Sequence, residues 1–138
     1  MTAKEYLGQA KSLDDLIGAK VRELRELEKD AELLKAVNTY DSNVKSGSAS
    51  DPMKVVDKII MMRNEINKEI RELVDLKAEI RQRINRVYNP QLVLLLTDKY
   101  INGLTLDDIA EDTGKSYETI KGWHGEALQI FRKENGMT

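Results

Sequence analysis

The sequence predicts an all-α protein in which a long antiparallel helical hairpin or coiled coil is followed by a three-helix domain with a helix-turn-helix. Three observations lead to this fold class. Apolar residues recur every seven positions along two long stretches, which is the spacing of coiled-coil helices. A run of small polar residues separates these two stretches. Beyond residue 88, asparagine, proline and glycine stand where short helices begin and end.

The first long stretch covers residues 6–34. Its apolar residues fall into two registers of one seam, with Tyr6, Leu13, Leu27 and Leu34 in the first and Ala10, Ile17, Leu24 and Ala31 in the second. Lys20 interrupts the seam. Two interpretations of Lys20 stay open: a polar residue at such a position sets the register or the choice of partner, or its flexible stem carries the charge out to solvent.

The second long stretch runs from about residue 53 to 88, after a loop at 42–52 (SNVKSGSASDP) whose small polar composition predicts a flexible connection. Its registers are Val56, Ile70 and Ile84, interrupted by Arg63 and Lys77, and Ile59, Ile66, Leu73, Ile80 and Val87. Two long helices joined by such a loop fold back as an antiparallel hairpin. Isoleucine-rich seams of this length rarely stay exposed to solvent, so we expect a homo-oligomer, most simply a dimer. Residues 1–88 form the first predicted domain.

Residues 89–138 form the second predicted domain, which begins with a helix from Pro90 to about Asn102. Asn89 is placed to cap this helix, and proline is favoured at the first helical position. Gly103 ends it. Its inner stripe consists of Leu92, Leu95, Leu96 and Tyr100.

Two further helices follow, separated by a turn at Gly114, where the chain needs a residue that tolerates positive φ. Thr105 caps the first of them and Ser116 caps the second. Ala110 is small enough to let the two helices cross closely. The last helix has an inner face of Ile120, Trp123, Ala127 and Phe131. The tail ENGMT (residues 134–138) is expected to fray.

This segment, GLTLDDIAEDTGKSYETIKGWHGEAL (residues 103–128), resembles region 4 of bacterial sigma factors, the module that reads promoter DNA. The shared frame is Gly-x-Thr, the acidic pair before Ile-Ala, the turn glycine, the serine cap and Thr-Ile in the second helix. With the N-terminal MTAKEYL, the whole chain resembles small proteins encoded by phages and prophages of Gram-positive bacteria, whose nearest relatives of known role are late-operon transcriptional activators. The resemblance implies a DNA-binding regulator of phage or prophage genes, acting beside RNA polymerase in the cytoplasm of the bacterial host cell.

The resemblance also implies which side chains face double-stranded DNA. It makes Ser116 the cap and a phosphate contact, and it makes Tyr117, Glu118, Lys121 and Gly122 the positions that face the major groove. A carboxylate at Glu118 accepts a hydrogen bond from cytosine N4, and Lys121 serves guanine or phosphate. For Glu118, a purely structural role in offsetting the helix dipole stays open as the alternative.

The charges are distributed unevenly along the chain. A net charge of −2 argues against a protein that coats nucleic acid through bulk positive charge. Residues 89–138 carry 5 basic and 8 acidic side chains, whereas residues 52–88 carry 9 and 6. We expect Arg81, Arg83 and Arg86, near the end of the second long helix and next to the C-terminal domain, to contact phosphates beside that DNA-reading domain. The alternative is a solvated helix face in which Glu79 and Arg83 pair at i, i+4.

The residue inventory argues against several other classes of function. The chain has no cysteine and one histidine, so neither a disulfide nor a metal centre is expected, and His124 is expected to pack or hydrogen-bond. There is no phosphate-cradling glycine loop and no nucleophile motif, so neither an enzyme nor a cofactor is expected. No apolar run is long enough to span a bilayer, and the N-terminus is charged from Lys4 onward, so neither a membrane anchor nor a signal peptide is expected.

Two hypotheses stay open beside the DNA-binding regulator. One is a protein-interaction module that docks on RNA polymerase or on another regulator, and the acidic C-terminal domain favours it. The other is a structural coiled-coil protein in which the helix-turn-helix is vestigial.

Overall fold

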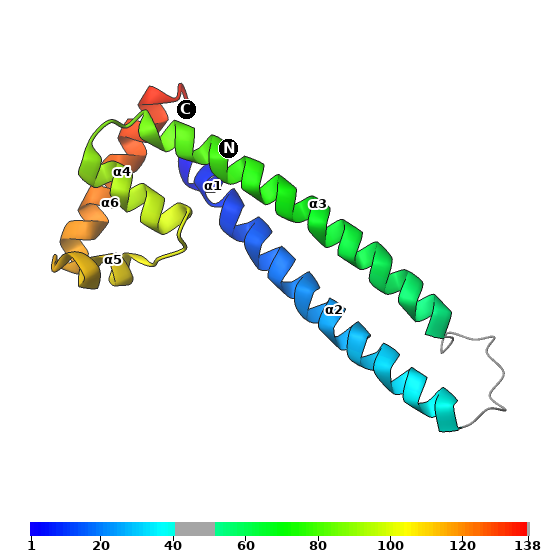
Figure 1. Cartoon of the computed structure of the whole chain (residues 1–138). Coiled ribbons are helices and arrows are strands. Elements are labelled where there is room, and N and C mark those ends of the chain that lie inside the picture. Colours follow the sequence, from blue (N-terminus) through cyan, green and yellow to red (C-terminus); the bar gives the residue numbers. More distant parts are fainter. Residues whose placement is uncertain (41–51, 138) are drawn as a thin grey trace. The chain divides into compact units, whose positions relative to one another are not determined.

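A computed structural model describes residues 1–40 and 52–137, and these residues form helices and connecting turns without any strand (Figure 1). The predicted all-α class is therefore confirmed for the described residues. The predicted loop at 42–52 lies outside them except for Pro52. None of the helices described is both long and apolar enough to cross a membrane. The elements are α1 (Ala3–Leu7), α2 (Gln9–Tyr40), α3 (Pro52–Asn85), α4 (Pro90–Tyr100), α5 (Leu106–Thr113) and α6 (Tyr117–Glu134).

The contacts divide the chain into two compact units, which we call the arm and the head. The arm is Asp15–Glu72, and the head combines Met1–Asp14 with Leu73–Thr138. This division differs from the predicted boundary between residues 88 and 89. The reason is that the last turns of α3 belong to the head, where Ile80 and Ile84 are fully buried.

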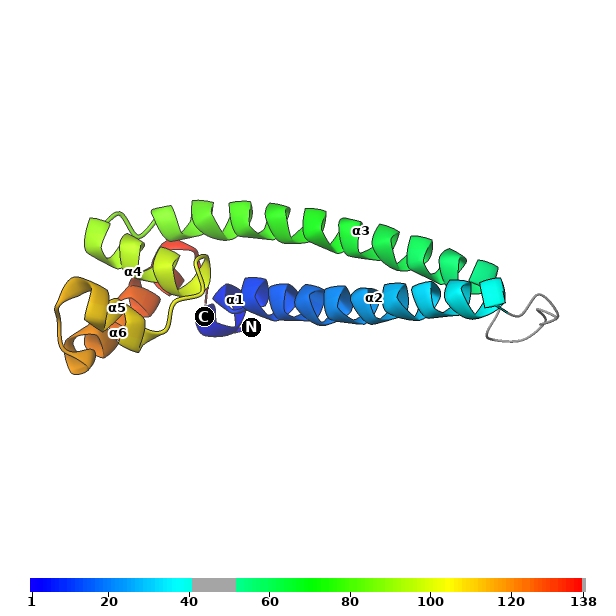
Figure 2. The same cartoon turned by 60° about the horizontal axis from the view of Figure 1, so that its bottom comes forward.

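In the arm, α2 and α3 run side by side in opposite directions, and two views turned by 60° agree on this (Figures 1 and 2). One predicted register of α3 is buried there, as Ile59 and Ile66 show. Of the other register, Ile84 is fully buried, whereas Val56 and Ile70 are exposed and Val55 is buried in place of Val56. The two registers lie on neighbouring sides of one helix, and a single partner helix covers only one of them.

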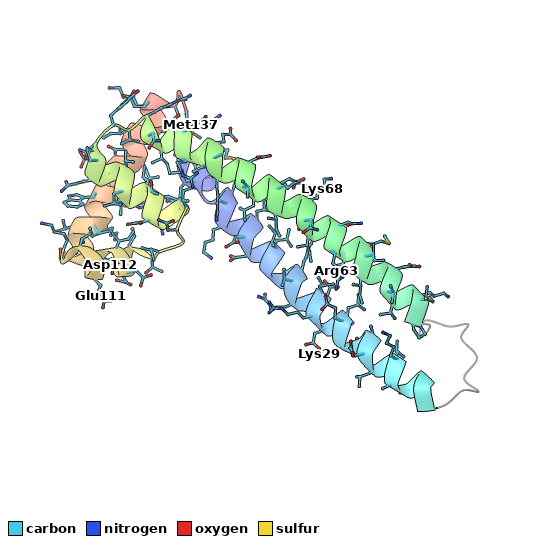
Figure 3. The ribbon with its side chains drawn as sticks, in the orientation of Figure 1. Lys29, Arg63, Lys68, Glu111, Asp112 and Met137 are labelled. Carbon is cyan, nitrogen blue, oxygen red and sulfur yellow. The ribbon has the colours of Figure 1, made fainter. Side chains whose placement is uncertain are left out.

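Lys20 links the two helices of the arm. Its ammonium forms ion pairs with Glu65, at 2.9 Å, and with Glu69, whose side chain is only 15% exposed. These two acceptors raise the pKa of Lys20. A second link joins Arg63 Nη2 to Glu28 Oε1 at 3.2 Å, and Figure 3 draws Arg63 on the arm. Lys20 therefore has interhelical partners, as the first of the two interpretations requires.

The head includes α1, which sequence periodicity had assigned to the long seam. The Tyr6 ring stacks on Phe131 of α6 with centroids 6.1 Å apart, and Leu7 is fully buried. Thr2 caps α1, and the helix ends at Gly8, after which α2 begins. Tyr6 is thus a core residue of the head rather than a seam residue of the arm.

The remaining helices of the head begin and end where the sequence predicted. Asn89 Oδ1 accepts from the amides of Gln91 and Leu92 ahead of α4. Thr105 and Asp108 form a reciprocal capping box at the start of α5, as their two hydrogen bonds of 3.1 and 2.9 Å show. The core between these helices consists of Leu95, Ile109, Ala110 and Ile120.

The C-terminal tail was expected to fray, but as far as Met137 it is hydrogen-bonded. Asn135 Nδ2 donates to the carbonyl oxygens of Arg83 and Phe131, and its Oδ1 accepts from Arg86. The amide of Met137 donates to the Arg132 carbonyl at 2.8 Å. The end of α6 is therefore tied to the end of α3 through one asparagine.

Ala110→Leu is expected to destabilise the head by about 1 to 3 kcal/mol, because Ala110 is only 8% exposed and a larger side chain overpacks the core. Urea unfolding followed by circular dichroism measures this loss. Glu111→Leu, at the exposed neighbouring position of the same helix, is the matched control and should change stability little. Equal stability of Ala110→Leu and wild type would show that this core tolerates the added volume.

Candidate functional site

The residues predicted to face DNA lie together on the first turns of α6. Ser116 caps the helix, since its hydroxyl oxygen accepts from the Thr119 amide at 3.1 Å. Tyr117 is 42% exposed, and Glu118, Lys121 and Gly122 are exposed as well. Fully buried Ile120 fixes the rotation of the helix, so these side chains point outward together.

The surroundings of this face are mainly acidic. Glu111 and Asp112 lie on the outer side of α5 (Figure 3), and Asp107 and Asp108 occupy its first turn. Hydrogen bonds from the Thr105 amide and hydroxyl lower the pKa of Asp108, which therefore stays ionised. A polyanion approaching the exposed face of α6 would meet these carboxylates, so any attraction must come from particular contacts rather than from the overall charge.

Of the three arginines predicted to contact DNA, Arg86 lies far from this face. Arg86 donates to Asn135 at 2.9 Å, at the C-terminal end of α6. An α-helix rises about 1.5 Å per residue, so the 18 residues of α6 place its two ends roughly 25 Å apart. That these arginines contact phosphates beside the C-terminal domain stays a prediction, and for Arg86 any such contact would lie at the far end of α6. The sequence could not reveal which end of α6 the end of α3 would reach.

Arg83 has structural partners instead. Its guanidinium pairs with Glu79 at 3.2 Å, as the alternative interpretation required, and lies 4.7 Å from the centre of the Tyr6 ring. Arg83 is also half-buried, unlike Arg81, which is exposed. This guanidinium thus helps to hold α1 within the head.

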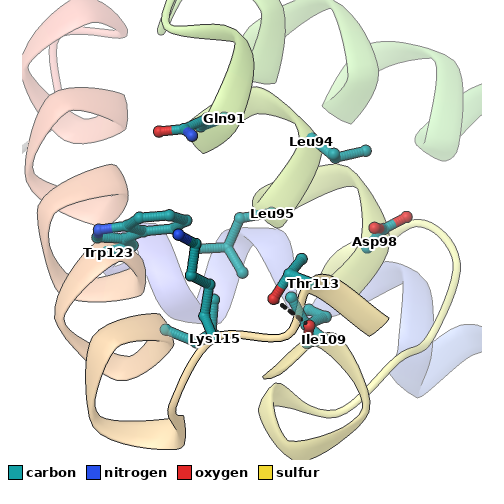
Figure 4. A pocket seen from close by; sticks show the side chains of 9 residues that line it. Gln91, Leu94, Leu95, Asp98, Ile109, Thr113, Lys115 and Trp123 are labelled. Atoms are coloured by element: carbon teal, nitrogen blue, oxygen red, sulfur yellow. Dashed lines mark hydrogen bonds between the residues drawn. The ribbon is translucent and has the colours of Figure 1, made fainter. Parts of the chain in front are cut away.

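A cleft of about 300 Å³ opens between α4, α5 and α6 (Figure 4). Its apolar floor and walls include Leu95, Ile109 and Ile120, and Lys115 and Asp98 carry charges at its edge. Trp123, predicted to be part of the core, is only half-buried and forms one wall. Leu94, which also lines the cleft, is 56% exposed. The sequence analysis missed this cleft, although three successive leucines at 94–96 cannot all face one core.

A buried polar pair lies on the inner side of α6. The Tyr100 hydroxyl and His124 Nε2 are 2.7 Å apart and hydrogen-bonded, and their rings stack with centroids at 5.8 Å. Burial, with the nearby charges of Lys99 and Lys4, lowers the pKa of His124 to about 4. Burial raises the pKa of Tyr100 to about 12. The expected packing and hydrogen-bonding role of His124 is confirmed.

A metal centre has no support within the described ranges, where no group of three or more histidine, cysteine or acidic side chains is placed to hold an ion. The polar features that remain are the exposed first turns of α6 and the cleft beside them. Both belong to the head, and both suit binding to another molecule.

The chain belongs to the family described as "Protein of unknown function (DUF1492)", whose model matches residues 33–131. The match includes all of α3, α4 and α5, and in α6 it ends at the buried Phe131. No curated protein and no solved structure matches the chain.

Lowering the pH is expected to destabilise the protein through His124. The pKa is about 4 in the folded state against 6.5 ordinarily, so between these values the unfolded chain binds more protons and stability falls as pH falls. The full effect is roughly 3 kcal/mol at 1.4 kcal/mol per pKa unit. Urea unfolding at pH 7 and pH 5 measures the slope, and His124→Leu should reduce it.

His124 is the only histidine of the chain, so an NMR titration reports its pKa without overlap. A pKa near 6.5 in the folded protein would contradict the predicted burial effect.

Proposed function

We propose that this protein is a DNA-binding transcriptional regulator of phage or prophage genes, active in the cytoplasm of a bacterial host cell. In this proposal α5, the turn at Gly114 and α6 act as a helix-turn-helix, and α6 enters the major groove. The observation that carries it is the exposed group at the capped start of α6, formed by Tyr117, Glu118 and Lys121. The likeness of residues 103–128 to sigma factor region 4 supports the same assignment.

Each side chain of this group has a role that its chemistry allows. Ser116 sits at a helix N-terminus, where backbone amides favour a phosphate. Glu118 accepts from cytosine N4, and Lys121, one turn further along the helix, donates to guanine or to phosphate. Gly122 has nothing within 4 Å of where a Cβ would stand, so the duplex can approach the helix closely at that position.

The excess of acidic side chains in residues 89–138, 8 against 5 basic, limits how tightly one copy holds DNA, because phosphate neutralisation supplies most of the nonspecific affinity. We infer that the protein compensates by oligomerising through its long helices. Exposed apolar side chains on the arm support this part of the proposal, among them Leu33, Met53 and Ile60. Two heads on one assembly raise the overall affinity without any new contact.

A second candidate function is docking on a protein, with RNA polymerase or another regulator as the partner. The cleft of about 300 Å³ favours it, because apolar walls with charges at the edge suit the anchoring side chain of a partner. The acidic side chains exposed on α5 suit a basic partner segment. The two functions use different residues and can be tested separately.

If the head reads DNA, Glu118→Ala and Lys121→Gln should differ in effect. Glu118→Ala should relax the preference at one base pair by roughly 1 to 3 kcal/mol. Lys121→Gln should weaken binding to all sequences alike and reduce the salt-dependence slope by about one unit. Binding to a selected site at several salt concentrations measures both effects.

Lys133→Gln removes a positive charge from the last turn of α6, at an exposed position outside the predicted DNA contacts, and is the control, which should leave the affinity for DNA unchanged. Unchanged affinity in both Glu118→Ala and Lys121→Gln would contradict DNA reading by α6.

If the cleft docks a protein, Leu94→Lys should weaken binding to purified bacterial RNA polymerase by at least roughly tenfold, because it puts a charge on an apolar wall. Leu94 is 56% exposed, so the variant should keep its stability. Tyr88→Ser changes another exposed residue that does not line the cleft and serves as the control. Equal binding of all three proteins would argue against the cleft as the polymerase site.

A further inference from the structure

Helix α3 carries a second apolar row beside its buried one. Met53, Val56, Ile60, Ile70 and Val74 are between 40% and 67% exposed. Their spacing continues in steps of three and four through Arg63 and Asn67, which fill the middle of the row. All of these positions lie on one uninterrupted helix, so they form a single stripe along it. Such a stripe is half of a helix-helix interface.

The row is chemically symmetric about Glu65. Val56 and Val74 lie nine residues to either side of Glu65, and Ile60 and Ile70 lie five residues to either side. Arg63 and Asn67, both polar, lie two residues away on opposite sides. When two copies of a helix pack antiparallel about a two-fold axis at Glu65, each residue faces its counterpart in this symmetry. Every apolar position of the row from 56 to 74 then meets an apolar one, and Arg63 meets Asn67.

Opposite charges also flank the row. Asp57 and Arg71 are exposed and stand next to Val56 and Ile70. With the two-fold axis at Glu65, Asp57 lies level with residue 73 of the other copy, so Arg71 of that copy is offset by two residues, about 3 Å along the helix. The two charged side chains can span this offset, and the pairing occurs twice. Opposite charges at flanking positions are what sets partner choice and orientation in paired helices.

Other arrangements match less well. If one helix of the antiparallel pair slides along the other by seven residues, Val56 faces Asn67 and Ile60 faces Arg63. Apolar side chains then meet polar ones, which is unfavourable. A parallel pair in register sets Arg63 against Arg63, two like charges at one level. Interfaces between two identical subunits use a surface that is complementary to itself under a two-fold rotation.

We propose that two copies of this chain associate through the exposed row of α3. The two helices run antiparallel, and the two-fold axis crosses them at the level of Glu65. This inference rests on the proposed oligomerisation. It specifies which side of α3 forms the interface, how the two helices are oriented and which residues face each other. The interface leaves the buried side of α3 against α2 undisturbed. The Lys20 ion pairs with Glu65 and Glu69 lie within one chain and keep that side in place.

Cysteine cross-linking tests the register directly, because the chain has no cysteine of its own. Ile60→Cys and Ile70→Cys, oxidised separately, should each give no covalent dimer, since neither position faces itself. The two variants mixed before oxidation should give a covalent heterodimer, which a mass tag on one of them identifies. Val56→Cys mixed with Val74→Cys should behave the same way. Lys58→Cys, on an exposed position outside the row, is the control and should not cross-link with either.

A charge exchange provides a second measurement. Asp57→Arg alone should weaken the dimer by roughly tenfold, because two attractive pairs become repulsive. Asp57→Arg combined with Arg71→Asp restores opposite charges across the axis and should recover the wild-type dissociation constant. Analytical ultracentrifugation of the full chain measures all three proteins.

The outcomes separate this inference from the broader proposal. A dimer in which Ile60→Cys cross-links with itself is either parallel in register or antiparallel about residue 60, and it overturns the proposed register while leaving oligomerisation intact. A dimer that gives no cross-link in any mixture uses another face, and the inference fails in the same way. A wild-type monomer at tens of micromolar overturns both the interface and the proposed oligomer, whereas DNA binding by Glu118 and Lys121 is judged by its own assay.

Discussion

Burial of the inner face of α6 is the constraint on which the head depends. Ile120, Ala127 and Phe131 on this face are fully buried, and α1, α4 and α5 all contact the helix. A helix held on one side by three others has only one free side. The position of Glu118 and Lys121 on that free side is therefore a consequence of packing at Ile120 and Phe131. The function proposed for the exposed face relies on core residues that never touch a ligand.

The parts of the fold that the sequence predicted well are those governed by local chemistry. Asn89, Thr105 and Ser116 cap their helices because a side-chain oxygen needs to reach only two or three residues along the chain. Gly114 ends α5 with a φ of 69°, a conformation that glycine adopts without strain. These signals do not depend on the rest of the molecule, so one sequence is enough to recognise them.

The parts predicted poorly depend on which segment covers which. A heptad pattern shows that Tyr6 and Ile84 are apolar and in register, but it cannot show that Phe131 stacks on Tyr6 or that Ile84 belongs to the head. The candidate site likewise has a part that the sequence predicted and a part that it did not. Helical periodicity was sufficient to group Ser116 to Gly122, whereas the placement of Arg86 and the opening of the cleft depend on how α3, α4 and α6 meet.

The excess of acidic side chains in residues 89–138 and the symmetric row of α3 fit one proposal. If the helix-turn-helix binds DNA as proposed, these acidic side chains keep the affinity of a single copy low, and useful occupancy then requires two heads on one assembly. If the assembly forms only through the exposed row of α3, DNA occupancy follows the concentration of dimer, which rises with the square of the concentration of chains while dimers are scarce. A regulator built in this way stays off DNA at low expression and responds steeply once its concentration approaches the dissociation constant of the dimer. The acidity that appeared to count against DNA binding then becomes the source of that threshold.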